Sequence, residues 1–340
     1  MALPAIEEIN LGPLVVPRVW NGLWQLSSPS WGTAPVGKIR REMGRHVEQG
    51  YYAFDMADHY GSAEQLFGQF RQSLPSPEKV VGATKWCIFR PTVASRAVVE
   101  EAVRERNLRM KSDHVDLLQI HWQDYSDKSY LDAIAHLRDL RDEGVITAIG
   151  LVNFDAIRTD EICTEMGPGV IVSNQVAFSL IDTRPLDGMA DVCLRHNVKL
   201  LTYGSLCGGF LGDKWLGQPE PDAYTETMTP SQRKYLDVIL TAWGGWTLFQ
   251  ALLAVLRTIG DRHGGLSIAN IATRWVLDHP FVGAVIIGAR MGVSEHTADN
   301  HHVFGFHLSK EDNDLIEGVL ERSNGRKLIQ TIGDCGAEYR

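Results

Sequence analysis

Four side chains that can exchange protons or carry charge recur at similar spacings in the first third of the chain. Lys85 follows Asp55 by 30 positions, His121 follows Lys85 by 36, and Tyr60 lies between the first two. A cation held beside a phenol favours its ionised form and makes it a better proton donor near neutral pH. A carboxylate beside that cation offsets the cost of burying it. Together the four groups suit the stabilisation and protonation of a negative charge that develops on oxygen.

These residues stand at or just after the ends of runs rich in Val, Ile and aromatic side chains, which predict β-strands. Regular alternation of strand-like and helix-like segments requires a parallel sheet, and eight such units close a barrel. We therefore expect an α/β fold, a (β/α)8 TIM barrel, whose strand ends bring the four residues to one mouth. The eight runs begin near Val19, Tyr51, Lys79, His114, Ile146, Val170, Lys199 and Val282.

Two additions to the barrel are expected, within a single domain that spans residues 1–340. Residues 9–17 predict an N-terminal hairpin that closes the bottom of the barrel. Val282 begins 83 positions after Lys199, where other intervals are close to 30, so a long insertion follows strand 7. It contains glycine- and proline-rich stretches and an apolar helical segment from about Ser231 to His263. Such insertions usually shape the mouth, and we expect a loop over the ligand with supporting helices.

Composition narrows the class of protein. The chain has 340 residues, 44% of them hydrophobic, and a formal net charge of −9, which argues against a nucleic-acid surface. Five cysteines, widely spaced and without a Cys-x-x-Cys pair, indicate neither a disulfide framework nor a thiolate zinc site. The N-terminus lacks a signal-peptide pattern, and the longest apolar stretch is too short to span a bilayer. We expect a cytoplasmic protein in a reducing compartment, with no membrane or nucleic-acid partner.

Three local patterns are similar to those of a known family. They are Phe-Asp-Met-Ala-Asp-His-Tyr-Gly at 54–61, Gly-Ala-Thr-Lys-Trp at 82–86 and Leu-Leu-Gln-Ile-His-Trp at 117–122. Through them the chain resembles the aldo-keto reductase family, over nearly its whole length. The resemblance implies an oxidoreductase that transfers hydride between NADPH and an aldehyde or ketone. Tyr60 would be the general acid, Lys85 its cation, Asp55 the partner of Lys85, and a neutral His121 a second hydrogen-bond donor.

The resemblance also implies a cofactor site at the remaining strand ends, and no Gly-x-Gly-x-x-Gly follows an early strand to suggest a Rossmann domain. Asn153 and Gln175 would bind the nicotinamide carboxamide, and Tyr203 would stack on its ring. Arg290 could contact a 2′-phosphate, which favours NADPH while leaving NADH possible. A helix beginning near Val293 or Ser294 would add its N-terminus. The remaining cofactor-binding candidates are Gly22, Trp24, Asp55, Leu206, Gly208, Gly288, His296 and Asn300.

The chain departs from the family pattern at several of these positions. Val152 and Gly204-Ser205 stand where members commonly have Ser and Ser-Pro, which removes one or two side-chain hydrogen bonds. Met291 replaces a common Ser, and His296 replaces a common second Arg. We expect a weaker phosphate clamp than usual.

The substrate pocket is expected to be aromatic. Trp24, Trp86 and Trp122 each stand beside a presumed active residue and are the candidates for substrate contact. Further aromatic side chains, Trp20, Phe89 and the segment Trp215–Tyr224, could add to it. The particular substrate and the oligomeric state stay open.

Three other functions remain possible from the residues alone. His59, Asp55, Asp58 and His121 could ligate the metal of a hydrolase, although no metal is expected. Lys85 could form a Schiff base in an aldolase. The third is a non-catalytic NADPH-binding regulator on the same fold.

Overall fold

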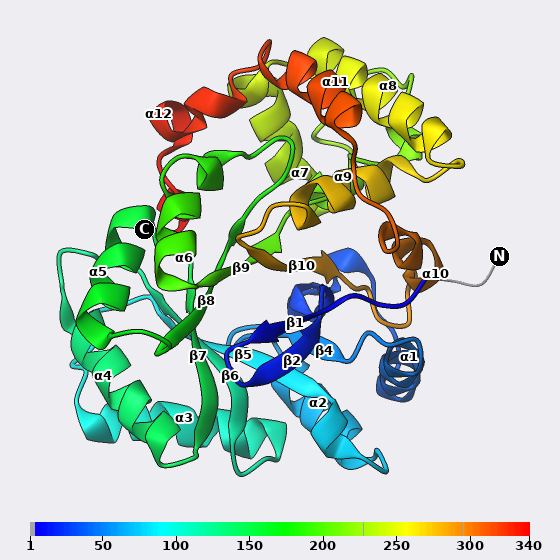
Figure 1. Cartoon of the computed structure of the whole chain (residues 1–340). Helices are drawn as coiled ribbons and strands as arrows, with labels where there is room; N and C mark the ends of the chain where they lie inside the picture. The colour runs from blue at the N-terminus through cyan, green and yellow to red at the C-terminus, as the bar shows by residue number, and fades with distance from the viewer. Residues whose placement is uncertain (1–3, 227, 295) are drawn as a thin grey trace.

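The computed structural model describes residues 4–226, 228–294 and 296–340. Eight parallel strands form a closed barrel in the order β10-β3-β4-β5-β6-β7-β8-β9, ringed by helices (Figure 1). The predicted (β/α)8 barrel is confirmed, and each strand begins within two positions of the expected residue. The strands are β3 (Val19–Gly22), β4 (Ala53–Asp55), β5 (Val81–Ile88), β6 (Val115–Trp122), β7 (Ile146–Val152), β8 (Ile171–Ala177), β9 (Lys199–Tyr203) and β10 (Val282–Gly288).

The helices of the outer ring bury their apolar stripes against the strands. In α4 the side chains of Tyr130, Ile134, Leu137 and Leu140 are buried, at the three- and four-residue spacing of one helix face. The ring consists of α1 (Val36–Glu48), α2 (Ala63–Gln72), α3 (Arg96–Met110), α4 (Ser129–Asp142), α5 (Ala156–Met166), α6 (Met189–His196) and α9 (Ile268–Leu277).

The predicted N-terminal hairpin is present and closes the end of the barrel where the strands begin. Its strands β1 (Glu8–Leu11) and β2 (Leu14–Pro17) pair antiparallel. Leu11 and Val16 pack in the barrel interior with side chains such as Val172. Gly12 turns the hairpin at a φ of 59°, where a Cβ would come within 2.5 Å of Val172 Cγ1. The opposite end of the barrel, where the strands finish, is called the mouth below.

The insertion after β9, barrel strand 7, is helical as expected but bent. It contains α7 (Pro230–Asp237), a π-helical turn (Val238–Trp243) and α8 (Trp246–Arg262), with the break at Gly244 and Gly245, which both have positive φ. Among the described residues no single helix is long and apolar enough to cross a membrane. In the part of the chain that the structure describes, the pair 230–243 and 246–262, bent by 105°, passes such a test by length and composition.

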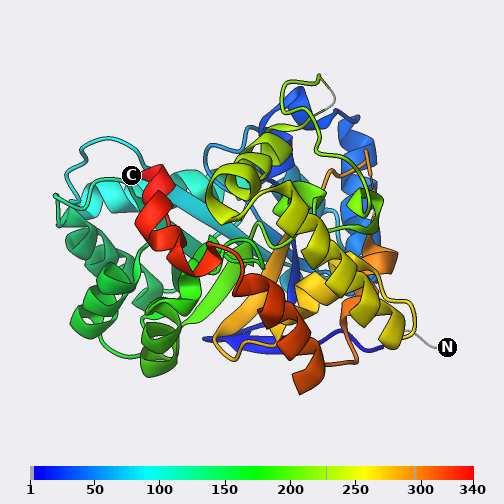
Figure 2. The same ribbon diagram turned by 90° about the horizontal axis from the view of Figure 1, so that it is seen from above.

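The C-terminal part of the chain returns to the mouth. After α10 (Thr297–Asn300) come α11 (Lys310–Leu320), which packs on α8, and α12 (Leu328–Ile332). A short turn, Ala337–Tyr339, then lies beside α7 and the strand ends, where the red segment in Figure 2 lies near the yellow-green insertion.

Candidate active site

Three of the four predicted catalytic residues are buried at one rim of the barrel, and the fourth lies beside them. Asp55 ends β4, Lys85 lies in β5 and His121 in β6, while Tyr60 follows β4 and is half-buried. Lys85 Nζ donates to Asp55 Oδ2 at 2.6 Å and to the Met56 carbonyl at 2.9 Å. The same nitrogen lies 4.9 Å from the centroid of the Tyr60 ring. The structure thus brings the four groups together.

The protonation of Tyr60 differs from expectation. Burial, and next the negative charge of Asp55, raise the pKa of Tyr60 well above its usual value of 10. The prediction that Lys85 makes the phenolate accessible is therefore wrong for this arrangement. The ammonium group donates to Asp55 and to a carbonyl, and it lies over the face of the Tyr60 ring. Tyr60 keeps its proton, and its hydroxyl makes no hydrogen bond to another described residue.

His121 is neutral, because burial lowers its pKa below the usual 6.5. Its Nδ1 lies 3.2 Å from the Val152 carbonyl oxygen, and its buried Nε2 has no partner among the described residues. A carbonyl oxygen only accepts, so we assign the hydrogen to Nδ1. Neutral His121 then presents a lone pair at Nε2 to the mouth. The predicted role of His121 as a hydrogen-bond donor to the substrate requires the other tautomer or a protonated ring.

Three residues assigned to nicotinamide binding meet at the ends of β7, β8 and β9. Asn153, at a φ of 58°, donates its backbone N–H to the Gln175 carbonyl at 2.9 Å. Tyr203 donates its hydroxyl to Asn153 Oδ1, also at 2.9 Å. Gln175 Nε2 donates to Asp55 Oδ1 at 2.7 Å, which connects this group to the four residues above.

Glycines line the neighbouring part of the rim. Gly22 pairs in register with Asp55 on one side and Gly288 on the other. A Cβ on Gly288 would lie 2.2 Å from Gln25 Nε2. Trp24 is 38% exposed, and its ring centroid lies 4.8 Å from that of Trp31. Glycine at position 288 therefore lets Gln25 pack directly against the backbone at the rim.

Leu206 and Gly208 lie where the insertion begins, beneath α7. Gly208 has a φ of 64°, and a Cβ there would meet the Gln232 backbone nitrogen at 3.1 Å. Trp31 Nε1 donates to Ser231 Oγ at 3.2 Å, so the segment after β3 reaches α7 across the mouth. The insertion thus adjoins the expected cofactor strip, as predicted for a loop over the ligand.

The segment after β10 differs from expectation. The helix begins at Thr297, not near Val293 or Ser294, and spans four residues, so the predicted start of this helix was wrong. Half-buried Arg290 donates from Nε to Ser294 Oγ at 3.1 Å and forms no ion pair with a described carboxylate. His296 is exposed, and its carbonyl accepts from the Asn300 backbone N–H at 2.8 Å. Within the described residues, the Arg290 guanidinium has no carboxylate partner.

Two of the three tryptophans predicted to contact substrate pack elsewhere. Side chains alternate along a strand, so Trp122 and Trp86 face the outer helices while His121 and Lys85 face inward. Trp122 packs edge-on against Tyr130 of α4, and Trp86 joins the same buried cluster. Trp20 is buried at the barrel bottom with Nε1 on the Pro17 carbonyl.

Other aromatic groups occupy the expected pocket. Phe89 is 51% exposed, and its ring lies 5.4 Å from those of His59 and His121. In the insertion, Trp215 packs against Phe210 within a local aromatic core, and Tyr224 is exposed. Trp24 and Phe89 are therefore exposed aromatic side chains that could contact a substrate.

The C-terminal turn supplies residues that the sequence analysis missed. The Tyr339 ring lies 6.3 Å from that of His121, and its hydroxyl accepts from Lys234 Nζ of α7 at 2.7 Å. Buried Arg184 holds this turn by bonding both carboxylate oxygens of Glu338 at 3.0 and 3.1 Å. No local pattern indicates a contact across more than 200 positions, so only the fold reveals it.

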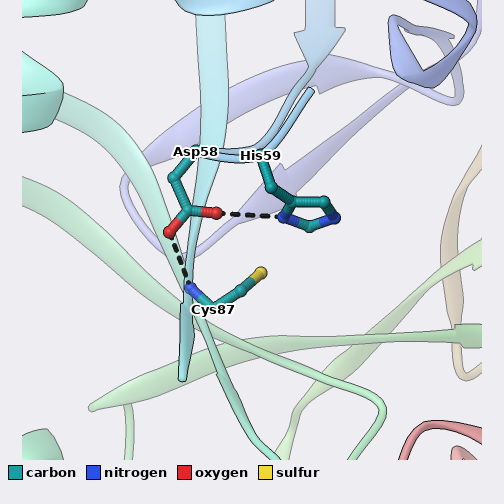
Figure 3. A group of neighbouring side chains, drawn as sticks. All are labelled: Asp58, His59 and Cys87. Atoms are coloured by element: carbon teal, nitrogen blue, oxygen red, sulfur yellow. Dashed lines mark hydrogen bonds and ion pairs between the residues drawn. The ribbon is translucent and has the colours of Figure 1, made fainter. Parts of the chain in front are cut away.

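A possible metal-binding group lies beside Tyr60. Ligand atoms of Asp58, His59 and Cys87 all lie within 4.8 Å of one another (Figure 3). Both oxygens of Asp58 already have partners: His59 Nδ1 at 3.0 Å, the Cys87 backbone N–H at 3.0 Å and Arg106 at 2.9 Å. Burial and Asp58 also raise the pKa of the Cys87 thiol well above 9, which opposes ligation by a thiolate. The cluster braces the Tyr60 loop against β5, and it does not favour the metal-hydrolase hypothesis.

The chain is similar to known proteins in sequence and in fold. Residues 18–321 match the model of the Aldo/keto reductase family. Aldo-keto reductase YhdN of Bacillus subtilis is 25% identical over 322 residues, covering 90% of each chain. Protein tas of Escherichia coli is 26% identical over 315 residues, covering 80% of this chain and 88% of that one.

Solved structures share the fold. The glycerol dehydrogenase AKR11B4 from Gluconobacter oxydans superposes with a TM-score of 0.74 at 24% identity, covering 94% of this chain and 95% of the other. The aldo-keto reductase AKR11C1 from Bacillus halodurans superposes with a TM-score of 0.70 at 22% identity, covering 94% and 97%.

The chain belongs to the aldo/keto reductase family. Membership supports an oxidoreductase that acts on small carbonyl compounds.

Proposed function

We propose that this protein transfers hydride between NADPH and the carbonyl group of an aldehyde or ketone, with Tyr60 as the general acid. The observation that carries the proposal is the hydrogen bonding of the four mouth residues. Lys85 is engaged by Asp55 and Met56, and neutral His121 presents a lone pair. The Tyr60 hydroxyl keeps its proton and has no described hydrogen-bond acceptor, so that proton is available to a ligand.

The rim fits a nicotinamide dinucleotide. Gly22 and Gly288 pair in register at the rim, Arg290 offers a guanidinium group without a described carboxylate partner, and His121 Nε2 is a buried atom with no described partner. Gly22, Trp24, Leu206, Gly208, Gly288, Asn300 and exposed His296 would line the cofactor. Asn153, Gln175 and Tyr203 would hold the nicotinamide, and Arg290 a 2′-phosphate. NADH would lack that last contact.

The bound cofactor supplies a hydride to the carbonyl carbon, which leaves a growing negative charge on the oxygen. Tyr60 transfers its proton to that oxygen and is left as a phenolate. The ammonium group of Lys85 lies over the ring that then carries the negative charge, 4.9 Å from its centroid, and attracts that charge. Asp55 keeps Lys85 in place throughout. Half-burial of Tyr60 limits the access of water to this exchange.

A substrate panel tests the proposal. Purified protein is mixed with NADPH and a series of aromatic, aliphatic and sugar-derived aldehydes and ketones, the loss of NADPH absorbance is followed, and the alcohol product is identified by mass spectrometry. We expect turnover with at least one class. NADPH binding without oxidation across the panel would contradict the proposal and support a non-catalytic regulator.

A further inference from the structure

A buried amide side chain spans the interior of the barrel beneath the mouth. Gln119, on β6, donates from Nε2 to Asp55 Oδ1 at 2.9 Å and accepts at Oε1 from Gln175 Nε2, also at 2.9 Å. Gln175 Nε2 donates in addition to Asp55 Oδ1 at 2.7 Å. All three side chains are buried, and Gln119 is completely so. Each lost bond would leave a buried polar atom unpaired.

The barrel geometry places these groups in one layer. Asp55, Gln119 and Gln175 lie on β4, β6 and β8, and alternate strands of such a barrel contribute side chains to the same interior layer. Gly150 on the intervening β7 leaves room for the bridge. A Cβ there would lie 2.5 Å from Ser173 Oγ and 3.2 Å from Gln119 Cγ.

The hydrogen bonds determine how the Gln175 amide is oriented. A carboxylate oxygen only accepts, so the NH2 group of Gln175 must face Asp55. Its two hydrogens are taken by Asp55 Oδ1 and Gln119 Oε1. Only Gln175 Oε1 remains, and it accepts no hydrogen bond from a described residue. The amide therefore offers an acceptor, not a donor, to a ligand in the mouth.

We propose that Gln119 is a positioning residue for hydride transfer, which holds Gln175 with its acceptor toward the nicotinamide carboxamide and Asp55 toward Lys85. The inference rests on the proposed function, because the contact between Gln175 and the cofactor belongs to it. Gln119 touches neither cofactor nor substrate. Its hydrogen bonds connect Gln175, which would bind the nicotinamide, to the Asp55–Lys85 ion pair beside Tyr60. Loss of Gln119 should therefore affect cofactor binding only through Gln175.

A double-mutant cycle with Gln119→Met and Gln175→Met tests this coupling. Dissociation constants are measured from tryptophan quenching for NADPH and for 2′,5′-ADP, which lacks the nicotinamide. We expect each single variant to weaken NADPH binding about fivefold, and the double variant no further than Gln175→Met alone. Binding of 2′,5′-ADP should not change. Additive losses, or equal losses for both ligands, would overturn the inference.

Measurement of kcat distinguishes a positioning role of Gln119 from a role in stability alone. Gln119→Met should lower kcat about tenfold with little change in KM for the carbonyl substrate. Thr84→Val is the matched control: it removes a fully buried hydrogen bond, to Glu64 at 2.6 Å, one position from Lys85 but outside the barrel interior. It should lower the melting temperature and leave kcat and both affinities unchanged. Unaltered kcat and affinities in folded Gln119→Met would contradict the inference.

A second variant and the wild-type turnover distinguish failure of the coupling from failure of folding or of the proposed function. If Gln119→Met does not fold, Gln119→Asn replaces it, because the amide is then one methylene too short to touch Asp55 and Gln175 together. Absence of turnover in the wild-type protein would overturn the proposed function, while the NADPH cycle would still test the coupling. Wild-type turnover with an additive cycle would overturn the coupling alone.

Discussion

Lys85 Nζ lies 2.6 Å from Asp55 Oδ2, and both side chains are almost completely buried where β4 and β5 reach the mouth. Removal of either partner of a buried ion pair leaves the other charge buried and unpaired, which destabilises the fold. It also keeps the Lys85 charge beside the Tyr60 ring. The stability of the fold and the chemistry of the mouth therefore depend on the same contact.

Removal of one partner should destabilise the protein strongly. Lys85→Met leaves the Asp55 carboxylate buried without its cation, and we expect a loss of about 3–5 kcal/mol in the free energy of unfolding. The double variant Asp55→Asn/Lys85→Met should recover part of that loss, since no charge is left unpaired. Urea denaturation of both variants checks this. Wild-type stability of Lys85→Met would contradict the pairing.

Arg290 should select NADPH over NADH. Arg290→Ala should weaken NADPH binding by about tenfold while leaving NADH binding unchanged, because only NADPH carries the 2′-phosphate. Arg290→Lys keeps the charge without the guanidinium group, and its NADPH affinity should lie between those of the wild type and Arg290→Ala. Fluorescence titration with both cofactors gives the answer. Equal losses for both would show that Arg290 does not read this phosphate.

Protonation of His121 should make kcat/KM for carbonyl reduction depend on pH in the acidic range. Burial lowers the pKa of His121 below 6.5, so at neutral pH its Nε2 presents a lone pair to a carbonyl oxygen. Protonation as pH falls through that pKa adds a donor at Nε2 while Nδ1 keeps the Val152 carbonyl. We expect kcat/KM for carbonyl reduction to rise below pH 6.5, and the rise to vanish in His121→Gln. A rate that falls in this range in the wild type, or a rise that persists in His121→Gln, would refute the assignment.

His114 should make stability depend on pH at the barrel bottom. Its hydrogen bond to Asp116, 3.2 Å away, raises the pKa of His114 from 6.5 to about 9. The contribution is complete below pH 6.5 and is lost as pH rises through about 9. The ring is partly exposed, so screening limits it to no more than about 1 kcal/mol. Urea midpoints of wild type and His114→Gln should differ at pH 6 and converge at pH 10; a constant difference would contradict this.

Periodicity and strand-end position predicted much of the site. Alternating runs located every barrel strand, and the parallel arrangement brought Asp55, Lys85 and His121 to one rim. Orientation was harder to predict: Trp122 follows His121 but faces the opposite side of the strand. Tyr339 reaches the mouth through a buried contact of Arg184 with Glu338, which no local pattern encodes. The Gln119 bridge also stayed hidden, because an amide in an apolar run does not show which partner it meets.

Substitution of Tyr60 by Phe tests whether this residue is the proton donor. It removes one hydroxyl group with no described hydrogen-bond partner, so folding and NADPH quenching of tryptophan fluorescence should be retained. Single-turnover reduction of the best panel substrate should slow by about 100- to 10,000-fold, because the proton donor is gone. A rate equal to that of the wild type would show that another group protonates the oxygen, and the account of this mouth would be contradicted.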